Sequence, residues 1–192
     1  MVNHSAHHSH RPWRRLLSRW KGIFASAFFT AFAGTALAES EASVKAAYLF
    51  NFAKLAEWPA AAFDGAKSPL IIGVVGRDPI TEELMRLFTR ATANGHPLEI
   101  RRVSASSARE LRACHIVFVP QSEDADGIIA SVQGSPVLVV GESEGFARRG
   151  GALGFVKQGE TLKFEANPKA AARNGVTVSS KLLRVAQSVV GK

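Results

Sequence analysis

The sequence has 192 residues, of which 46% are hydrophobic, and its 24 basic and 16 acidic residues give a formal net charge of +8. A charge this positive would suit a nucleic-acid-binding protein, but its distribution along the chain argues against that class. The single cysteine, Cys114, excludes an internal disulfide.

The amino terminus has the three parts of a secretory signal peptide. Residues 1–21 carry five basic and no acidic residues, and residues 22–37 form an uncharged run rich in Ala and Phe. Ala36-Leu37-Ala38 then provides the small residues that a signal peptidase recognises, so we expect residues 1–38 to be removed. An uncleaved anchor is the weaker alternative, because the run is shorter than the roughly 20 apolar residues of a spanning helix. The pair Arg14-Arg15 leaves the twin-arginine export route open.

Removing this signal changes the charge argument. Residues 39–192 hold 19 basic and 16 acidic residues, a formal charge of +3, and keep two of the six histidines. No nucleic-acid partner is therefore expected. The 154 remaining residues suffice for one domain with its own hydrophobic core, and no repeat or linker divides them.

Beyond the signal, helical and strand patterns alternate along the chain. In chain order the predicted elements are a long helix over 41–57, a buried strand over 70–75, a helix from Asp78-Pro79 to Arg90, a strand over 98–103, a short helix over 107–112, a strand over 115–120, a helix over 126–132 and a strand over 136–140. Strands that alternate with helices over short connections indicate a parallel sheet with helices on both faces.

The pattern changes after Gly145. Residues 152–157 and 161–167 flank Gly159-Glu160 and predict an antiparallel hairpin. A final helix over 179–190 is predicted to place an apolar stripe on the core, formed by Leu182, Val185, Ala186, Val189 and Val190. The predicted fold class is α/β: a single three-layer domain with a mainly parallel sheet, helices on both faces, and a C-terminal antiparallel hairpin plus final helix.

The first helix is amphipathic, with one exception. Its polar arc holds Asn51, Lys54 and Glu57, and Phe50 falls among them. A single exposed aromatic residue needs no explanation, but a helix with aromatic residues on both sides suits burial between two surfaces. Phe50 is therefore a candidate contact with a second subunit or a partner protein.

Residues 141–145, Gly-Glu-Ser-Glu-Gly, match the nucleophile-elbow pattern of serine esterases. No His or Asp follows Ser143 to complete a catalytic triad, and two neighbouring carboxylates would oppose the oxyanion that forms during attack. A hairpin also follows where the elbow needs a helix. We therefore interpret the motif as a polar turn and expect no catalytic residues, with an esterase as the weakest alternative.

Residues 73–78 resemble a shortened nucleotide-binding turn, but Asp78, Glu82 and Glu83 occupy the helix end that would have to receive phosphate. The stronger alternative is a small-molecule binding module with a cleft at the carboxyl ends of the strands, lined by Arg77. Residues 39–192 offer only His96, Cys114 and His115 as soft metal ligands, without convergent spacing, so neither a metal nor another cofactor is expected.

Several further segments are informative as an ordered set. Residues 44–54, which close on Glu57-Trp58-Pro59, are similar to the opening helix of the YfiR family of periplasmic regulators. Residues 114–120 resemble the central strand of that family. Its closing blocks are matched in order by Gly150-Gly151, residues 164–167 and residues 179–183. The resemblance covers about residues 43–189.

The resemblance implies a regulator and not an enzyme. Such regulators are periplasmic α/β proteins that form dimers and bind the outward-facing sensory domain of an inner-membrane diguanylate cyclase, keeping it inactive. Release of this inhibition raises cyclic di-GMP and favours attachment and biofilm formation, and an outer-membrane lipoprotein can sequester the regulator. Inhibition requires only that the regulator bind the inactive cyclase more tightly than the active one.

We expect the partner-binding residues on exposed parts of the first helix and of the closing blocks. They are Phe50, Glu165, Asn167, Lys181 and Arg184. The alternative for Asn167 is a capping or turn role, and for Lys181 and Arg184 it is a solvated charge.

Members of the family can carry further cysteines, one of them in the strand where this chain has Gly73, and their disulfides link stability to redox state. Cys114 has no internal partner, so such control is excluded here. Cys114 leads into an apolar run, which predicts a buried thiol. The alternative is a thiol that pairs between two molecules.

Overall fold

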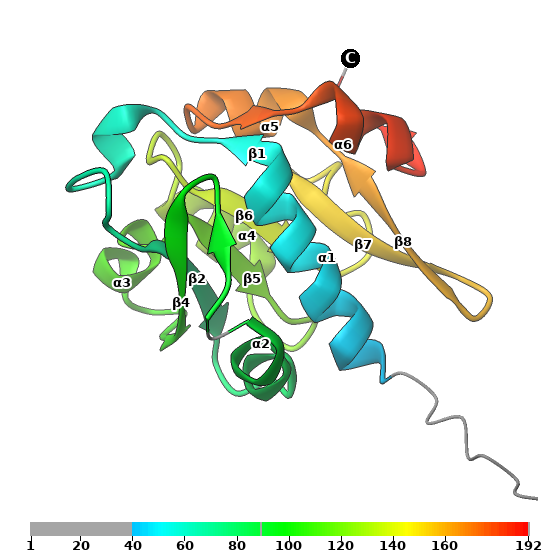
Figure 1. The fold of residues 1–192 in the computed structure, drawn as a ribbon. Coiled ribbons are helices and arrows are strands. Elements are labelled where there is room, and N and C mark those ends of the chain that lie inside the picture. Colours follow the sequence, from blue (N-terminus) through cyan, green and yellow to red (C-terminus); the bar gives the residue numbers. More distant parts are fainter. Residues whose placement is uncertain (1–39, 89, 192) are drawn as a thin grey trace, which may run out of the picture. The chain divides into compact units, whose positions relative to one another are not determined.

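A curled eight-stranded sheet organises the computed structural model, which describes residues 40–88 and 90–191 (Figure 1). The strand order is β10-β8-β7-β6-β5-β2-β4-β3. These strands are β2 (Leu70–Val75), β3 (Thr92–Ala93), β4 (His96–Val103), β5 (Ile116–Val119), β6 (Leu138–Gly141), β7 (Leu153–Gln158), β8 (Thr161–Ala166) and β10 (Ser188–Val189). Neighbours from β4 to β7 are parallel, whereas β7 and β8 form an antiparallel hairpin. A separate ribbon pairs β1 (Ala56–Glu57) with β9 (Thr177–Val178).

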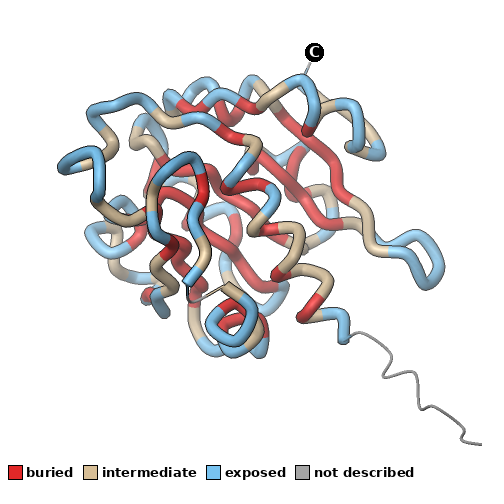
Figure 2. Tube along the Cα trace, in the orientation of Figure 1, coloured by how far each residue is buried: buried red, intermediate tan, exposed pale blue. Residues whose placement is uncertain are grey.

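Helices cover both faces of this sheet. They are α1 (Glu41–Leu55), α2 (Ile80–Phe88), α3 (Ala108–Arg112), α4 (Ala125–Ser131), α5 (Pro168–Arg173) and α6 (Ser180–Val185), with a 3-10 turn η1 at Ala60–Ala62. Alternate residues of β2 point to opposite faces. Ile72 shares one core with α1, α2, α5 and α6, and Ile71 shares the other with α3 and α4. Figure 2 shows the buried strands between these layers, and the arrangement confirms the predicted fold class.

The direction of strand addition reverses at β2. β4 lies on one side of β2, whereas β5, β6 and β7 follow one another on the other side. The chain therefore passes α2 on one face and returns past α3 on the opposite face. In α/β sheets such a reversal leaves a crevice at the carboxyl ends of the strands, which is where a ligand would be sought.

The long helix α1 begins and ends for local reasons. The Ser40 side chain caps it by accepting a hydrogen bond from the Ser43 N–H at 3.1 Å. The helix ends at Leu55, two residues before the predicted end, because Ala56 and Glu57 become extended and pair with β9. Directly after β9, the Ser179 N–H donates to the carbonyl of Leu55, the last residue of α1, at 3.0 Å.

An aromatic cluster joins α1 to the hairpin. Phe52 packs on Phe155 and Phe164 with ring centroids 5.9 and 5.0 Å apart, and Tyr48 contacts the same two rings edge-on at 5.7 Å. The Tyr48 hydroxyl donates to the Leu162 carbonyl at 3.1 Å. Such ring pairs add stabilisation beyond the area they bury. The hairpin is thus fixed against α1 along most of its length.

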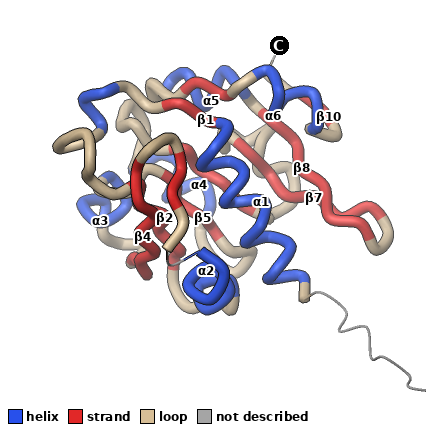
Figure 3. Tube along the Cα trace, in the orientation of Figure 1, coloured by secondary structure: helices blue, strands red, loops and turns tan. Residues whose placement is uncertain are grey.

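The prediction of a final helix over 179–190 is wrong in its second half. α6 ends at Val185, and the backbone then becomes extended. The Gln187 N–H donates to the Phe164 carbonyl at 2.8 Å, and β10 pairs in parallel with β8 (Figure 3). The edge of β8 would otherwise leave its backbone groups unpaired, which favours a strand over further helix. Val185 is consequently 68% exposed instead of lying in the core stripe.

The helix α5 was not predicted, although its start carries a recognisable signal. The Asn167 side chain accepts a hydrogen bond from the Ala170 N–H at 2.9 Å, and Pro168 takes the first helical position. Asp78-Pro79 predicted α2 on the same grounds. The segment over 168–173 is rich in Ala and has no large apolar stripe, which hid the helix from a periodicity argument.

The predicted export signal, residues 1–38, lies outside the described residues. Residues Ala38–Lys192 form one compact unit, and both hydrophobic cores lie within its described part. Within residues 40–88 and 90–191, no helix has the length and apolar character needed to span a membrane.

Cys114 lies in the second core, directly behind Gly73. Its side chain is 3% exposed and donates to the Glu110 carbonyl at 3.3 Å, which confirms the predicted burial. Burial raises the pKa of the Cys114 thiol to about 11. A thiol that is buried and hard to ionise is a poor partner for an intermolecular disulfide.

Gly73→Ala should lower the free energy of unfolding by about 1–3 kcal/mol, because a Cβ at this position would lie 2.6 Å from the Cys114 Sγ. In a Cys114→Ala background the same change should cost less, and a double-mutant cycle by urea unfolding measures the difference. Gly65→Ala is the control, since an added Cβ there meets nothing within 4 Å. Equal costs of Gly73→Ala in both backgrounds would contradict this packing.

Candidate functional site

A cleft of about 570 Å³ opens at the carboxyl ends of β5 and β6. Gln121 follows β5 and Glu142 follows β6, so both line it from the sheet side. The first turns of α1 and the β7–β8 hairpin form the other walls, with Lys45 and Lys157 among the lining residues. The cleft therefore lies at the carboxyl edge of the sheet, one strand away from the reversal between β2 and β5.

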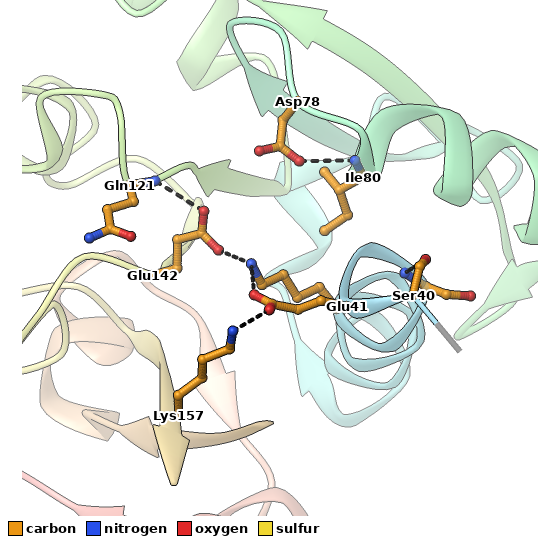
Figure 4. Close-up of polar contacts among 9 residues, drawn as sticks. Ser40, Glu41, Asp78, Ile80, Gln121, Glu142 and Lys157 are labelled. Atoms are coloured by element: carbon orange, nitrogen blue, oxygen red, sulfur yellow. Dashed lines mark hydrogen bonds and ion pairs between the residues drawn. The ribbon is translucent and has the colours of Figure 1, made fainter. Parts of the chain in front are cut away.

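A row of alternating charges crosses this cleft (Figure 4). The Lys45 Nζ lies 2.7 Å from one Glu41 oxygen and also contacts Glu142. The second Glu41 oxygen lies 2.5 Å from the Lys157 Nζ. The remaining Glu142 oxygen accepts the backbone N–H of Gln121 at 3.1 Å. The order is therefore Lys157, Glu41, Lys45 and Glu142, from the hairpin to the sheet.

These contacts favour the charged forms of Lys45 and Glu41. Burial disfavours the ammonium of Lys45, but its hydrogen bonds to Glu142 and Glu41 outweigh this effect and raise its pKa above the ordinary value. Hydrogen bonds from Lys157 and Lys45 lower the pKa of Glu41 to about 2. Lys45 and Glu142 are the least exposed members, with 14% and 15% of their side chains accessible.

The row of charges attaches α1 to the carboxyl edge of the sheet and to the hairpin. Its cations and carboxylates face one another, so each charged group already has a partner of opposite charge. Among the described residues, no group of three or more His, Cys, Asp or Glu side chains is placed to hold a metal ion. The geometry of this cleft supports a structural attachment better than a prepared ligand site.

Arg77 is not among the residues that line this cleft. It is exposed in the turn after β2, where Gly76 adopts a left-handed backbone with φ of 67°. The cleft follows β5 and β6, and its cations come from α1 and β7.

Ser143 lies in a turn folded around Phe146. Its hydroxyl accepts a hydrogen bond from the Arg149 Nη2 at 2.7 Å, and turns follow it where a nucleophile elbow has a helix. Phe146 is 1% exposed, and its ring occupies the space that side chains at Gly141 and Gly151 would need. The first Gly of the G-x-S-x-G pattern therefore serves the packing of Phe146.

Glu165 and Asn167 were predicted to be exposed, and this is wrong for both: they are 8% and 6% exposed. Glu165 accepts hydrogen bonds from the Arg148 guanidinium at 3.0 Å and from the Ser188 hydroxyl at 2.9 Å. Asn167 caps α5 and donates its amide to the Ala147 carbonyl at 2.8 Å. The two side chains are buried because they fasten β10 and the loop over 142–151 to β8.

Lys181 and Arg184 are exposed on α6, as predicted. Positions three and four apart lie on one helix face, so Val185 joins them, while Leu182 points into the core with 2% exposure. We call Lys181, Arg184 and Val185 the α6 face. It presents two cations beside an exposed branched apolar side chain. The exposure of Val185 could not be predicted from the sequence, because it depends on where α6 ends.

Phe50 is half-buried against α2. Its ring stacks on Phe88 with centroids 4.4 Å apart and planes 16° from parallel, and the Lys54 Nζ lies 5.2 Å from its centroid. This stacking accounts for an aromatic residue on the polar arc of α1. In the described part of the chain, no hydrogen bond or ring contact joins Phe50 to Lys181 or Arg184. The predicted partner residues are thus spread over α1, β8, the cap of α5 and α6.

Two comparisons with known proteins found a match. The family model described as YfiR/HmsC-like matches residues 42–187. A crystal structure of a conserved domain protein from Vibrio cholerae O1 biovar El Tor str. N16961 is similar with a TM-score of 0.52 and 13% sequence identity. The match covers 78% of this chain and 60% of that one, and at this identity the likeness concerns the fold alone. No curated protein matches the sequence.

Lys45→Met should lower the free energy of unfolding by about 1–3 kcal/mol, because it leaves the Glu41 and Glu142 carboxylates without their shared ammonium. Urea unfolding measures this loss. Arg86→Met is the matched control: it breaks the Arg86–Glu83 pair, in which Arg86 is 61% exposed, and should cost less than about 1 kcal/mol. Similar losses for both variants would refute the attachment role of Lys45.

Proposed function

The chain belongs to the YfiR/HmsC-like family, and from this premise we propose that it is a periplasmic regulator that binds and represses a membrane-bound diguanylate cyclase. The family is one of regulators of diguanylate cyclase signalling and not of enzymes. The observation that carries the proposal is the extent of the match, residues 42–187, which includes α1 without its first residue, the whole sheet except β10, and α6.

The proposed mechanism is repression by binding. The regulator binds the periplasmic sensory domain of the cyclase and prefers its inactive form, so that binding shifts the cyclase population toward inactivity. Release of the regulator raises cyclic di-GMP. We also propose that the protein forms a homodimer and that an outer-membrane lipoprotein sequesters it.

We propose the α6 face as the principal contact with the cyclase. Lys181 and Arg184 supply charge for steering and orientation, and Val185 supplies an apolar anchor beside them. The surface on the cyclase that complements the α6 face is acidic and surrounds a small apolar pocket. Phe50 is proposed as a second contact on α1. Glu165 and Asn167 contribute indirectly, because they hold β10 and the loop over 142–151 in place.

The proposed location requires export and processing. Cleavage after Ala38 would leave Glu39 as the first residue, immediately before the cap of α1. The mass of the protein recovered from the periplasm should therefore correspond to residues 39–192. Recovery of the uncleaved chain in the membrane fraction would argue for the anchor alternative.

Deleting the gene should raise cellular cyclic di-GMP several-fold, and the wild-type gene should restore the original level. The double variant Lys181→Glu with Arg184→Glu should fail to restore it, because reversing both charges repels an acidic partner surface. The nucleotide is measured by mass spectrometry in cells with matched protein levels.

The control reverses two other exposed cations, Lys67 and Arg109, and should restore repression like the wild type. An unchanged nucleotide level in the deletion strain would refute the proposed function. Full repression by the Lys181→Glu, Arg184→Glu variant would refute the α6 face alone.

A further inference from the structure

The segment over 58–69 is held at the amino ends of the strands by two histidines. The Phe63 ring lies between the rings of His96 and His115, with centroid distances of 3.8 and 4.4 Å and planes 7° and 20° from parallel. The Nδ1 of His96 lies 2.7 Å from the Ser68 carbonyl oxygen, and the Nε2 of His115 lies 3.0 Å from the Ala62 carbonyl oxygen. None of the η1 residues in this segment is buried. Apart from the partly buried Trp58 and Phe63, which pack against the first core, the segment is held by these histidine contacts.

The contacts of His115 admit only one protonation state. Its Nδ1 accepts the Ile71 N–H at 3.1 Å, and a backbone N–H can only donate. The Nδ1 atom must therefore be unprotonated, and the Nε2–H donates to the Ala62 carbonyl. A proton on Nδ1 would place two donors face to face. The residue is 6% exposed, and this burial lowers the pKa of His115 below its ordinary value.

The charged groups around His115 come from three elements. His96 and Arg101 of β4 disfavour a second positive charge, and Asp64 of the 58–69 segment favours it. Arg112 of α3 lines the same pocket, of about 390 Å³, as Arg101 and His115. Asp64 is exposed, and its effect on the pKa of His115 does not outweigh the effect of burial. The surroundings thus keep His115 neutral while the segment is closed.

His96 differs in a way that provides a control. Its Nδ1–H donates to the Ser68 carbonyl, and a proton added at Nε2 would leave that hydrogen bond intact. The imidazolium would still lie on the face of Phe63, where a cation is favoured. Protonation of His96 therefore does not require the segment to move.

We propose that His115 is an acid-sensitive latch. A proton at Nδ1 forces the ring away from the Ile71 N–H, and the displaced ring loses its hydrogen bond to the Ala62 carbonyl and its stacking on Phe63, which releases the 58–69 segment from the amino ends of β2 and β5. This device lies within the chain itself and does not depend on the proposed cyclase partner. In the open segment His115 regains an ordinary pKa of about 6.5, whereas the closed segment binds the proton more weakly. Opening is therefore least favoured above pH 6.5 and gains up to about tenfold per pH unit below it.

Trp58 reports on the latch directly. Its Nε1–H donates to the His115 carbonyl at 3.1 Å, and the two rings lie 6.0 Å apart. In a chain that begins at Ala38, the compact unit with both cores, Trp58 is the only tryptophan. Between pH 8 and 5 its emission should shift to the red, and the exchange protection factor of the Ile71 amide should fall by up to about tenfold per pH unit below 6.5. The far-UV circular dichroism should stay constant.

Two variants separate the histidines. His115→Gln cannot titrate and should make both readouts independent of pH, whereas His96→Gln should keep the transition. Unchanged emission and protection in the wild-type chain would overturn the proposal, whatever the variants do. A transition that survives in His115→Gln, one that disappears in His96→Gln, or a loss of helical signal over the same pH range would also overturn it.

Discussion

The packing of α1 across one face of the sheet is the interaction on which the rest of the structure depends. Its inner side contributes Leu49 and Phe52 to the first core, and Tyr48 and Phe52 fix the β7–β8 hairpin through their ring contacts. Lys45 joins its first turns to Glu142 after β6. At its other end the chain becomes β1, which pairs with β9 directly before α6. The α6 face is therefore positioned through α1.

Much of the sheet could be predicted because its signals are local. The central parallel strands are short apolar runs that end at glycine or proline, and such runs need no knowledge of the rest of the chain. The hairpin follows in the same way from Gly159-Glu160. The end of α6 could not be predicted, because it depends on the unpaired edge of β8, which exists only once the hairpin has formed.

The polar residues show the same division between local and distant causes. Lys181 and Arg184 are exposed as predicted, since the buried side of α6 follows from its own sequence. Glu165 and Asn167 looked like surface residues, but their partners Ser188 and Ala147 are about twenty positions away along the chain. His115 is a stronger case, because its role depends on Ile71 and Ala62, which no spacing rule connects to it. Side chains whose partners lie in other elements are what a sequence pattern cannot assign.

The central claim, that this chain represses a membrane diguanylate cyclase by binding its periplasmic domain, is tested most directly by capture from intact membranes. The affinity-tagged protein would be expressed from its own gene, cross-linked in living cells and purified under denaturing conditions, and its attached proteins would be identified by mass spectrometry. We expect recovery of an inner-membrane protein with a diguanylate cyclase domain, cross-linked to peptides that include α6. If no cyclase is recovered while the tagged protein still lowers cyclic di-GMP in the same cells, repression by direct binding is contradicted.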